Sequence, residues 1–396
     1  MAGPEEVWYP MPTYKQCILD TYSATVKFLD QSNGNYSYPF DFFRDLKKYG
    51  DFPTRDFAVV FGLAVFWTIA RYLLTLFVYK LKTYDKDDKP IGLFFNLTPL
   101  NQKKFPESAW KWMFYMFTWS YSIYILFFTD RRFFQQPLLV WQDWVPSLVM
   151  PFDIYLMYMI QCSFYIHSIY ATLFMDQWRK DSIVMMFHHF LTLSLIGFSY
   201  AVRYHKVGAL VLFVHDVTDI CLEFTKCNVY LKDRGGRFYA FHDILSTIGF
   251  IFFASTWFIF RLYWFPLKVL HSAGHGAMTY APSLPVFWFF FNVMLWILQI
   301  LNIYWFMFIV NFLYKIATGQ MKEVDDIREN EVDEKCKRVQ HKPMNGFAGG
   351  HVTNHVGENN HVMNNHKKVE NNQHTNSNNI IKHRKSTKTM ENHVHG

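Results

Sequence analysis

Seven long apolar runs between residues 57 and 315 constrain the fold of this chain more than any other feature. A helix of about 20 apolar residues crosses the hydrocarbon core of a bilayer. Only helices and closed barrels satisfy every backbone polar group in lipid. The runs therefore predict an all-α integral membrane protein with about seven transmembrane helices. Their expected bounds are 57–79, 109–128, 154–174, 182–200, 207–229, 244–264 and 286–314.

The composition divides the chain into two unlike parts. Hydrophobic residues make up 51% of the 396 residues, yet the mean hydropathy is −0.01 because residues 319–396 are almost wholly polar. A segment with so few apolar residues cannot bury a core, so we expect a disordered tail over 319–396, first acidic and then rich in Asn and His. The five cysteines show neither metal nor disulfide spacing, and we expect free thiols.

Lysines indicate the orientation of the chain in the membrane. Six of them follow the first run, between residues 80 and 104, and a lysine-rich connection is typical of the cytosolic side. Residues 1–56 would then be lumenal, the linker 80–105 cytosolic and, after seven crossings, the tail cytosolic. Asn35 begins an Asn-Tyr-Ser sequon in the lumenal segment and is a glycosylation candidate, whereas the sequon at Asn96 would face the cytosol.

The fourth and fifth runs carry ionisable side chains in their interiors. A charge at the centre of a membrane helix costs at least about 2.5–3.5 kcal/mol, so such side chains pair with one another or line a wet cavity. At the helical rise, His188 lies about 9 Å from the start of its run and Asp219 about 15 Å from the end of its own. The short connection makes the runs antiparallel neighbours, so both groups lie in the same half of the membrane. The set comprises His188, His189, His215, Asp216, Asp219 and Glu223, with Lys226 beyond them.

The spacing of these residues favours a shared site. His215, Asp219 and Glu223 follow one another at intervals of four and lie on one helix face. His188 and His189 are about 100° apart, so only one of them points squarely at that face. A histidine suits general-base work, and a buried carboxylate can orient it. The set fits acyl transfer to an amine; a metal site and a structural polar network are the alternatives.

The stretch 179–226 resembles the Lag1 motif of ceramide synthases, a group within the TLC domain family. The matching residues are RKDSIVMMFHHFLTLSLIGFSYAVRYHKVG and LVLFVHDVTDICLEFTK, together with PESAWK at 106–111, QCSFYIHSIYATLFMDQWRKD at 161–181 and FRLYWFPLKVL at 260–270. The resemblance implies a six-helix TLC catalytic domain over 106–318, preceded by one N-terminal span at 57–79. The linker 80–105 is too short for the homeobox-like insert of many animal members, so the chain resembles the homeobox-free group, which favours stearoyl-CoA.

The resemblance also implies a reaction and its residues. A sphingoid base N-acyltransferase condenses fatty acyl-CoA with sphinganine or sphingosine to give (dihydro)ceramide and CoA in the endoplasmic reticulum membrane. The essential His pair of the family falls on His188 and His189, one of which would be the base or a transient acyl acceptor. The Asp pair falls on Asp216 and Asp219, which would orient the histidine and bind the amine. The supporting residues are His215, Glu223 and Lys226.

Three further residues have two interpretations each. Arg179 and Lys180 are candidates for binding the acyl-CoA phosphates, and the alternative is that they anchor the helix at the cytosolic surface. His167 is a candidate for lining the cavity, and the alternative is a core histidine with its hydrogen bonds satisfied.

The expected partners are acyl-CoA, a sphingoid base, the lipid bilayer and a second ceramide synthase in a homodimer or heterodimer. We expect no nucleic acid, cofactor or metal. Two rival functions are a non-catalytic TLC relative that binds lipid or assists the translocon, and a metal-dependent lipid hydroxylase, which would need more His ligands. We also expect Arg261 to reach the lumenal interface. The connection 271–285 should be a turn, shaped by glycines and prolines, that closes the lumenal end of an acyl slot.

Overall fold

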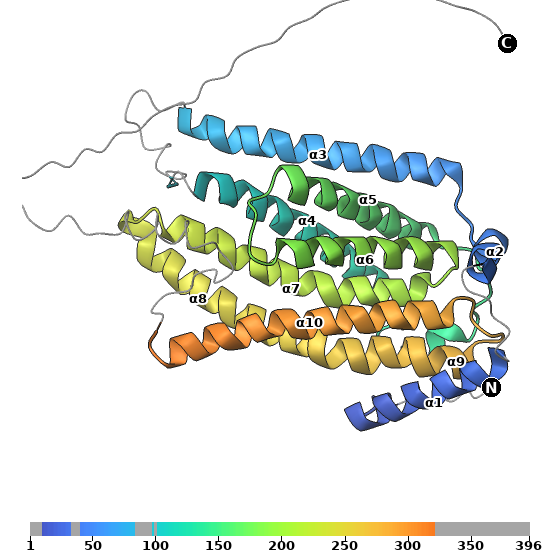
Figure 1. Ribbon diagram of the computed structural model, residues 1–396. Coiled ribbons are helices and arrows are strands. Elements are labelled where there is room, and N and C mark those ends of the chain that lie inside the picture. The colour runs from blue at the N-terminus through green and yellow to red at the C-terminus, as the bar shows by residue number, and fades with distance from the viewer. Residues whose placement is uncertain (1–9, 33–39, 84–96, 99–100, 321–396) are drawn as a thin grey trace, which may run out of the picture. The chain divides into compact units, whose positions relative to one another are not determined.

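The computed structural model describes residues 10–32, 40–83, 97–98 and 101–320, and these residues form helices without strands. Long helices cover all seven predicted runs and alternate in direction (Figure 1), which confirms the all-α fold. They are α3 (Thr54–Thr83), α4 (Asn101–Phe127), α5 (Phe152–Phe174), α6 (Ser182–Ala201), α7 (His205–Lys232), α8 (Tyr239–Thr256) and α10 (Trp288–Ala317). We name the two ends of this bundle by the residues that lie there, the Ser182 end and the Tyr204 end.

Within the described residues, four helical stretches are long and apolar enough to cross a membrane by length and composition. They are Thr54–Val78, Ser182–Ala201, Tyr239–Tyr280 and Trp288–Ala317. The helices α4, α5 and α7 are not among them, since polar residues interrupt their apolar faces. The multi-pass architecture is therefore supported, and the number of seven crossings stays a prediction.

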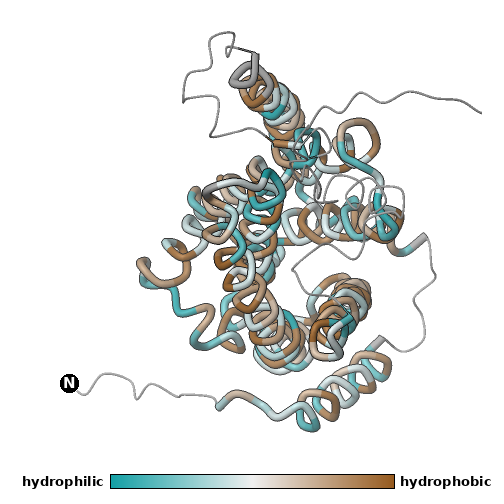
Figure 2. Tube along the Cα trace, turned by 90° about the vertical axis from the view of Figure 1, so that its left-hand side faces the viewer, coloured by the Kyte–Doolittle hydropathy of each residue, from teal (hydrophilic) through white to brown (hydrophobic). Residues whose placement is uncertain are grey.

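Helix α3 lies at the edge of the bundle, where it contacts α4 and α5 (Figure 1). Its outer face exposes large apolar side chains, among them Phe57, Phe61 and Phe77 at 59–66% of their full area. Seen nearly end-on, the helices of the bundle carry many apolar residues (Figure 2). Apolar surface of this extent is stable in lipid and costly in water, so the bundle suits a bilayer.

Helix α7 positions the predicted site. It packs against α4 and α8 and also contacts α6 and residues 257–270. Because protein surrounds it on several sides, its interior polar residues find protein partners, and His215, Asp216, Glu223 and Lys226 are all buried. This environment explains how the least apolar of the seven runs occupies the centre of the bundle.

The turn expected over residues 271–285 is largely a helix. Helix α8 continues through π-helical residues Trp257–Leu270 and Ser272–Gly276 into α9 (Ala277–Tyr280), and only 281–287 are non-helical. Gly276 has an ordinary helical φ of −59°. A Cβ at this position would lie 3.1 Å from Leu138 and 3.3 Å from Trp141. Gly276 therefore permits close packing between segments, and the prediction of a glycine-shaped turn was wrong there.

Residues 1–56, which we expected only as a lumenal segment, contain two helices. They are α1 (Tyr14–Ser32), which lies along residues 257–280, and α2 (Phe40–Tyr49). Pro12 and Pro53 precede helices and interrupt none of the described ones. The four cysteines in the described residues are free, as expected. Asn35, most of the linker 80–105 and the tail from residue 321 lie outside the described residues.

Candidate functional site

Two cavities meet inside the helix bundle. The walls of the first are mostly apolar residues of α6, α7 and α10. The second is larger and extends to the Ser182 end, where charged residues line it. We call them the apolar cavity and the polar cavity. Among the described residues, only Tyr165 and His188 line both.

Of the predicted histidine pair, His188 is the one that stands at this junction. Its ring lies edge-on to Trp305, with 5.2 Å between ring centroids. His189 lines the polar cavity alone, and its ring centroid lies 6.0 Å from that of Tyr165. The Nδ1 atoms of His188 and His189 are buried and have no hydrogen-bond partner among the described residues. Each imidazole therefore has a nitrogen available for a bound molecule.

His215 is held in place by both of its ring nitrogens. Nδ1 lies 2.8 Å from the carbonyl oxygen of Val211, and since a carbonyl only accepts, Nδ1 carries the proton. Nε2 then accepts from the Asn302 amide at 3.3 Å. His215 lines the apolar cavity, and protein groups occupy both of its ring nitrogens.

Arg261 is a site residue that the sequence did not reveal. It is 3% exposed, and its Nη2 donates to the carbonyl oxygen of His215 at 3.0 Å and to Asp219 Oδ1 at 2.8 Å. Its guanidinium also lies 4.1 Å from the ring centroid of Trp257. The expectation that Arg261 reaches the interface was wrong, because the helix that carries it turns this residue toward α7.

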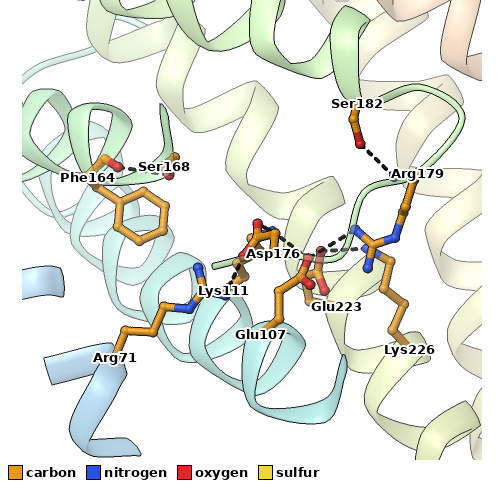
Figure 3. A network of polar contacts seen from close by, with 10 residues as sticks. All are labelled: Arg71, Glu107, Lys111, Phe164, Ser168, Asp176, Arg179, Ser182, Glu223 and Lys226. Atoms are coloured by element: carbon orange, nitrogen blue, oxygen red, sulfur yellow. Dashed lines mark hydrogen bonds and ion pairs between the residues drawn. The ribbon is translucent and has the colours of Figure 1, made fainter. Parts of the chain in front are cut away.

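A charged network lines the polar cavity near the Ser182 end (Figure 3). Lys111 Nζ donates to Glu107 at 2.8 Å and to Asp176 at 3.0 Å. Arg179 donates to the same Glu107 oxygen at 3.0 Å, and Arg71 of α3 pairs with Asp176. Glu107 and Lys111 lie four apart in the PESAWK segment at 106–111, which was a signal for this pair. We did not predict Glu107, Lys111 or Asp176 as site residues, since the contacts that join this pair to Asp176 and Arg179 link segments far apart in the sequence.

The structure brings most of the predicted site residues to these two cavities. Asp219 and Glu223 line the polar cavity, as predicted from their spacing, and so do Lys226 and Arg179. Lys226 donates to Glu223 at 2.8 Å. Asp219 and Glu223 of α7 therefore line the same cavity as His188 of α6, which agrees with their common helix face and their similar depth in the bundle.

Three predicted residues line neither cavity. Asp216 Oδ2 accepts from Thr118 at 2.9 Å and from Gln161 at 2.6 Å, so this carboxylate joins α7 to α4 and α5. Its other carboxylate oxygen, Oδ1, is buried without a hydrogen-bond partner among the described residues, and the expected contact of Asp216 with the amine stays a prediction. Lys180 is exposed and outside the cavities.

His167 is the third of these residues. Its Nδ1 lies 2.9 Å from the Thr68 hydroxyl of α3, and its ring packs edge-on to Trp110. It is 2% exposed. His167 is thus a core histidine between α3, α4 and α5, and its proposed place in the cavity wall was wrong.

The sequence pattern of the TLC domain matches residues 104–311. The chain belongs to the TLC domain family. Human ceramide synthase 1 is 51% identical over 62% of this chain and 70% of its own length. Mouse ceramide synthase 1 is 42% identical over 81% of this chain and 88% of its own length. Mouse ceramide synthase 4 is 36% identical over 59% and 55% of the two lengths.

The TLC-family match includes every residue that lines the two cavities except Phe312, and it covers every predicted catalytic residue from His188 to Asp219. The resemblance inferred from the Lag1-like stretch is therefore confirmed, down to the ceramide synthase 1 group. Among the described residues, one group of histidine and carboxylate ligands has metal-like spacing, and it lies outside both cavities.

Proposed function

We propose that this chain is a sphingoid base N-acyltransferase, which condenses fatty acyl-CoA with sphinganine or sphingosine to form (dihydro)ceramide and CoA. The observation that carries the proposal is the position of His188, where an apolar cavity meets a charged one. An acyl thioester needs this combination, since its hydrocarbon chain and its reacting carbonyl require opposite surroundings. The similarity to proteins named ceramide synthase 1 supports the same activity.

The apolar cavity would hold the acyl chain, with the thioester carbonyl beside His188. The amine nitrogen attacks this carbonyl, and the neutral imidazole of His188 takes the proton that the nitrogen loses. The C–S bond then breaks, and the CoA sulfur leaves as a thiolate that receives this proton. A transient acyl group on His188 would use the same geometry. His189, which lines only the polar cavity, would contact the polar end of the substrate.

Other groups at the junction would stabilise the charges of the reaction. The Tyr165 side chain lines both cavities, and its hydroxyl would donate to the oxyanion formed on the carbonyl. Asp219 and Glu223 line the polar cavity and would attract the ammonium form of the sphingoid base, which would lose one proton to solvent before the neutral amine attacks. A non-catalytic lipid-binding relative would have no need of buried imidazole nitrogens without partners at this junction.

We place the Ser182 end of the bundle in the cytosol and the amino terminus in the lumen of the endoplasmic reticulum. The lysines that follow α3 support this orientation. Acyl-CoA would then enter from the cytosol past Arg179, which lines that end of the polar cavity. Lys180, exposed nearby, would meet the CoA phosphates in solution. The partners are therefore acyl-CoA, a sphingoid base and the bilayer, with a second such chain as the expected dimer partner.

We also propose that the far end of the apolar cavity measures the acyl chain and favours stearoyl-CoA. Trp141, Ala273, Trp288 and Asn292 line this end, and Ala273 belongs to the helix that replaces the expected turn. Each buried methylene is worth about 0.8 kcal/mol, so a chain that fills the cavity is preferred over a shorter one. Ala273→Leu should shorten the preferred chain by shortening the cavity.

The test is an assay of the purified full chain with sphinganine and a mixed C14 to C24 acyl-CoA panel. Ceramide and free CoA should form together, with C18 ceramide as the main product and shorter products in Ala273→Leu. Gly197→Ala is the matched control, because a Cβ there meets no atom within 4 Å. Absence of ceramide from a folded protein would overturn the proposed function. An unchanged profile in an active Ala273→Leu variant would place the length selection elsewhere.

A further inference from the structure

A cluster of metal-ligand residues lies on the helix that continues from α8 and on the amino-terminal helix α1. Its members are Asp20, His271 and His275, whose ligand atoms all lie within 4.8 Å of one another. Asp20 Oδ2 is 2.9 Å from His271 Nε2, and the two imidazole rings stack with 5.1 Å between centroids. None of the three residues lines either cavity. The proposed acyl transfer therefore gives them no role.

The spacing of the two histidines suits a shared ion. They lie four apart in the segment HSAGHG, so the helix presents both on one face, as helical zinc-binding motifs do. The third ligand comes from a segment 251 residues away in the chain. His271 is buried, whereas Asp20 and His275 are half-buried, so an ion from solution can reach the cluster.

We propose that Asp20, His271 and His275 bind a divalent transition-metal ion, for which Zn²⁺ is the best match. Two imidazole nitrogens and one carboxylate oxygen are a donor set for such borderline ions, whereas Ca²⁺ and Mg²⁺ prefer oxygen ligands. Zinc bonds of about 2.0–2.1 Å place tetrahedral ligands roughly 3.3 Å apart. The separation of 2.9 Å between Asp20 Oδ2 and His271 Nε2 is near this value, and no pair of ligand atoms is more than 4.8 Å apart, so side-chain rotations complete three corners of the site. Water would take the fourth corner.

The surrounding contacts indicate what the ion would do. Helix α1 follows the long helix: the Tyr14 hydroxyl donates to the Leu262 carbonyl at 3.0 Å, and Lys27 Nζ donates to the Met278 carbonyl at 2.9 Å. The metal cluster lies between these two contacts along both helices. A bound ion would therefore fasten α1 to the long helix at its middle.

This attachment bears on the apolar cavity. Ala273 lies between the two histidines in the chain and lines that cavity. An ion held by residues on both sides of Ala273 and by α1 would restrict the movement of the cavity wall at this point. The alternative explanation is that Asp20 and His271 form only a hydrogen bond that docks α1.

The experiment compares the full chain with Asp20→Asn and His275→Gln after purification without chelators. Asp20→Asn keeps a hydrogen-bonding side chain of the same shape and removes the charged ligand, while His275→Gln leaves the Asp20–His271 contact intact. The matched control is His242→Gln, because His242 is a partly buried helical histidine bound to Asn228 and outside the cluster. Nine of the 17 histidines lie in residues 341–395, and they are the same in all four proteins.

Two measurements decide the outcome. Zinc titration against a chromophoric chelator should show one more tight site per chain in the wild type and His242→Gln than in the two cluster variants. EDTA should lower the Tm of the wild type by several degrees and leave that of His275→Gln unchanged, because only the wild type loses a bound ligand. Equal zinc binding in all four proteins, with equal responses to EDTA, would overturn the metal site. The hydrogen bond between Asp20 and His271 would then be the only role of the cluster. Neither measurement depends on the proposed acyl transfer.

Discussion

Arg261 holds one wall of the polar cavity in place by joining two helices through a single guanidinium nitrogen. That nitrogen donates both to the His215 carbonyl and to the Asp219 carboxylate. Hydrogen bonds to charged groups contribute about 1.5–3 kcal/mol, and a carboxylate left without its cation is unfavourable in this setting. Arg261 thus orients Asp219 toward the cavity and steadies the helix that carries both His215 and Asp219.

Arg261→Met should lower the Tm of the purified chain and reduce ceramide synthesis. The free energy of unfolding should fall by about 2–3 kcal/mol, because one charge-assisted hydrogen bond is lost and the Asp219 carboxylate no longer has a cation beside it. The double variant Arg261→Met with Asp219→Leu should recover stability, because no unpaired carboxylate is left, while synthesis stays low. Thermal unfolding and initial rates of ceramide formation measure the two effects. A single variant with wild-type Tm would show that this pair is unimportant for the fold.

The residues of the candidate site were predictable from the sequence to different degrees. Asp219 and Glu223 face one cavity with His188 because helical spacing and depth are properties of single helices. Arg261 could not be predicted, since its direction depends on π-helical turns that no local signal indicates. The partners of Asp176 were likewise hidden, because Arg71 and Lys111 lie on other helices.

At the scale of elements, the long helix formed by α8, the π-helical residues and α9 sets the far end of the apolar cavity. The sequence of this segment contains glycine and proline, which usually indicate a turn. Packing outweighs that tendency here: Gly276 lets Leu138 and Trp141 approach the helix backbone, and Trp141 Nε1 donates to Ser272 at 3.1 Å. The glycine and proline content of this segment therefore indicated a turn, whereas the backbone at Gly276 is helical.

Gly276→Val should therefore destabilise the protein by roughly 1–3 kcal/mol, because added atoms must displace well-packed neighbours. Gly197→Ala is the control, since it adds a Cβ into open space within α6 and improves helix propensity. The Tm values of both variants in the same detergent provide the comparison. Equal Tm values for the two variants would contradict the close packing described at Gly276.

At the scale of the whole molecule, the seven apolar runs predicted seven long helices that alternate in direction through the bundle. Hydropathy alone supports four membrane-spanning stretches in the part of the chain that the structure describes, and the other helices of the bundle are more polar because they meet protein partners. Helix α1 was not predicted, since its sequence is not strongly apolar overall and the helix it packs against, residues 257–280, is far away in the chain. The orientation rests on the lysines after α3 and is open to direct measurement.

With the amino terminus in the lumen, Asn35 should carry an N-linked glycan and Asn96 should not. Endoglycosidase treatment should shift the electrophoretic mobility of the wild type and of Asn96→Gln, and leave that of Asn35→Gln unchanged. A glycan on Asn96 would reverse the proposed orientation and move the polar cavity to the lumenal side.

The central claim is that His188 acts at the junction of the two cavities. The most direct measurement is the initial rate of ceramide formation from stearoyl-CoA and sphinganine by equal amounts of folded wild type, His188→Ala and His242→Ala. A positioned general base contributes about 10²- to 10⁴-fold, so His188→Ala should lose at least about 100-fold, while His242→Ala keeps the wild-type rate. Ceramide formation by His188→Ala within a few-fold of the wild-type rate would contradict this account.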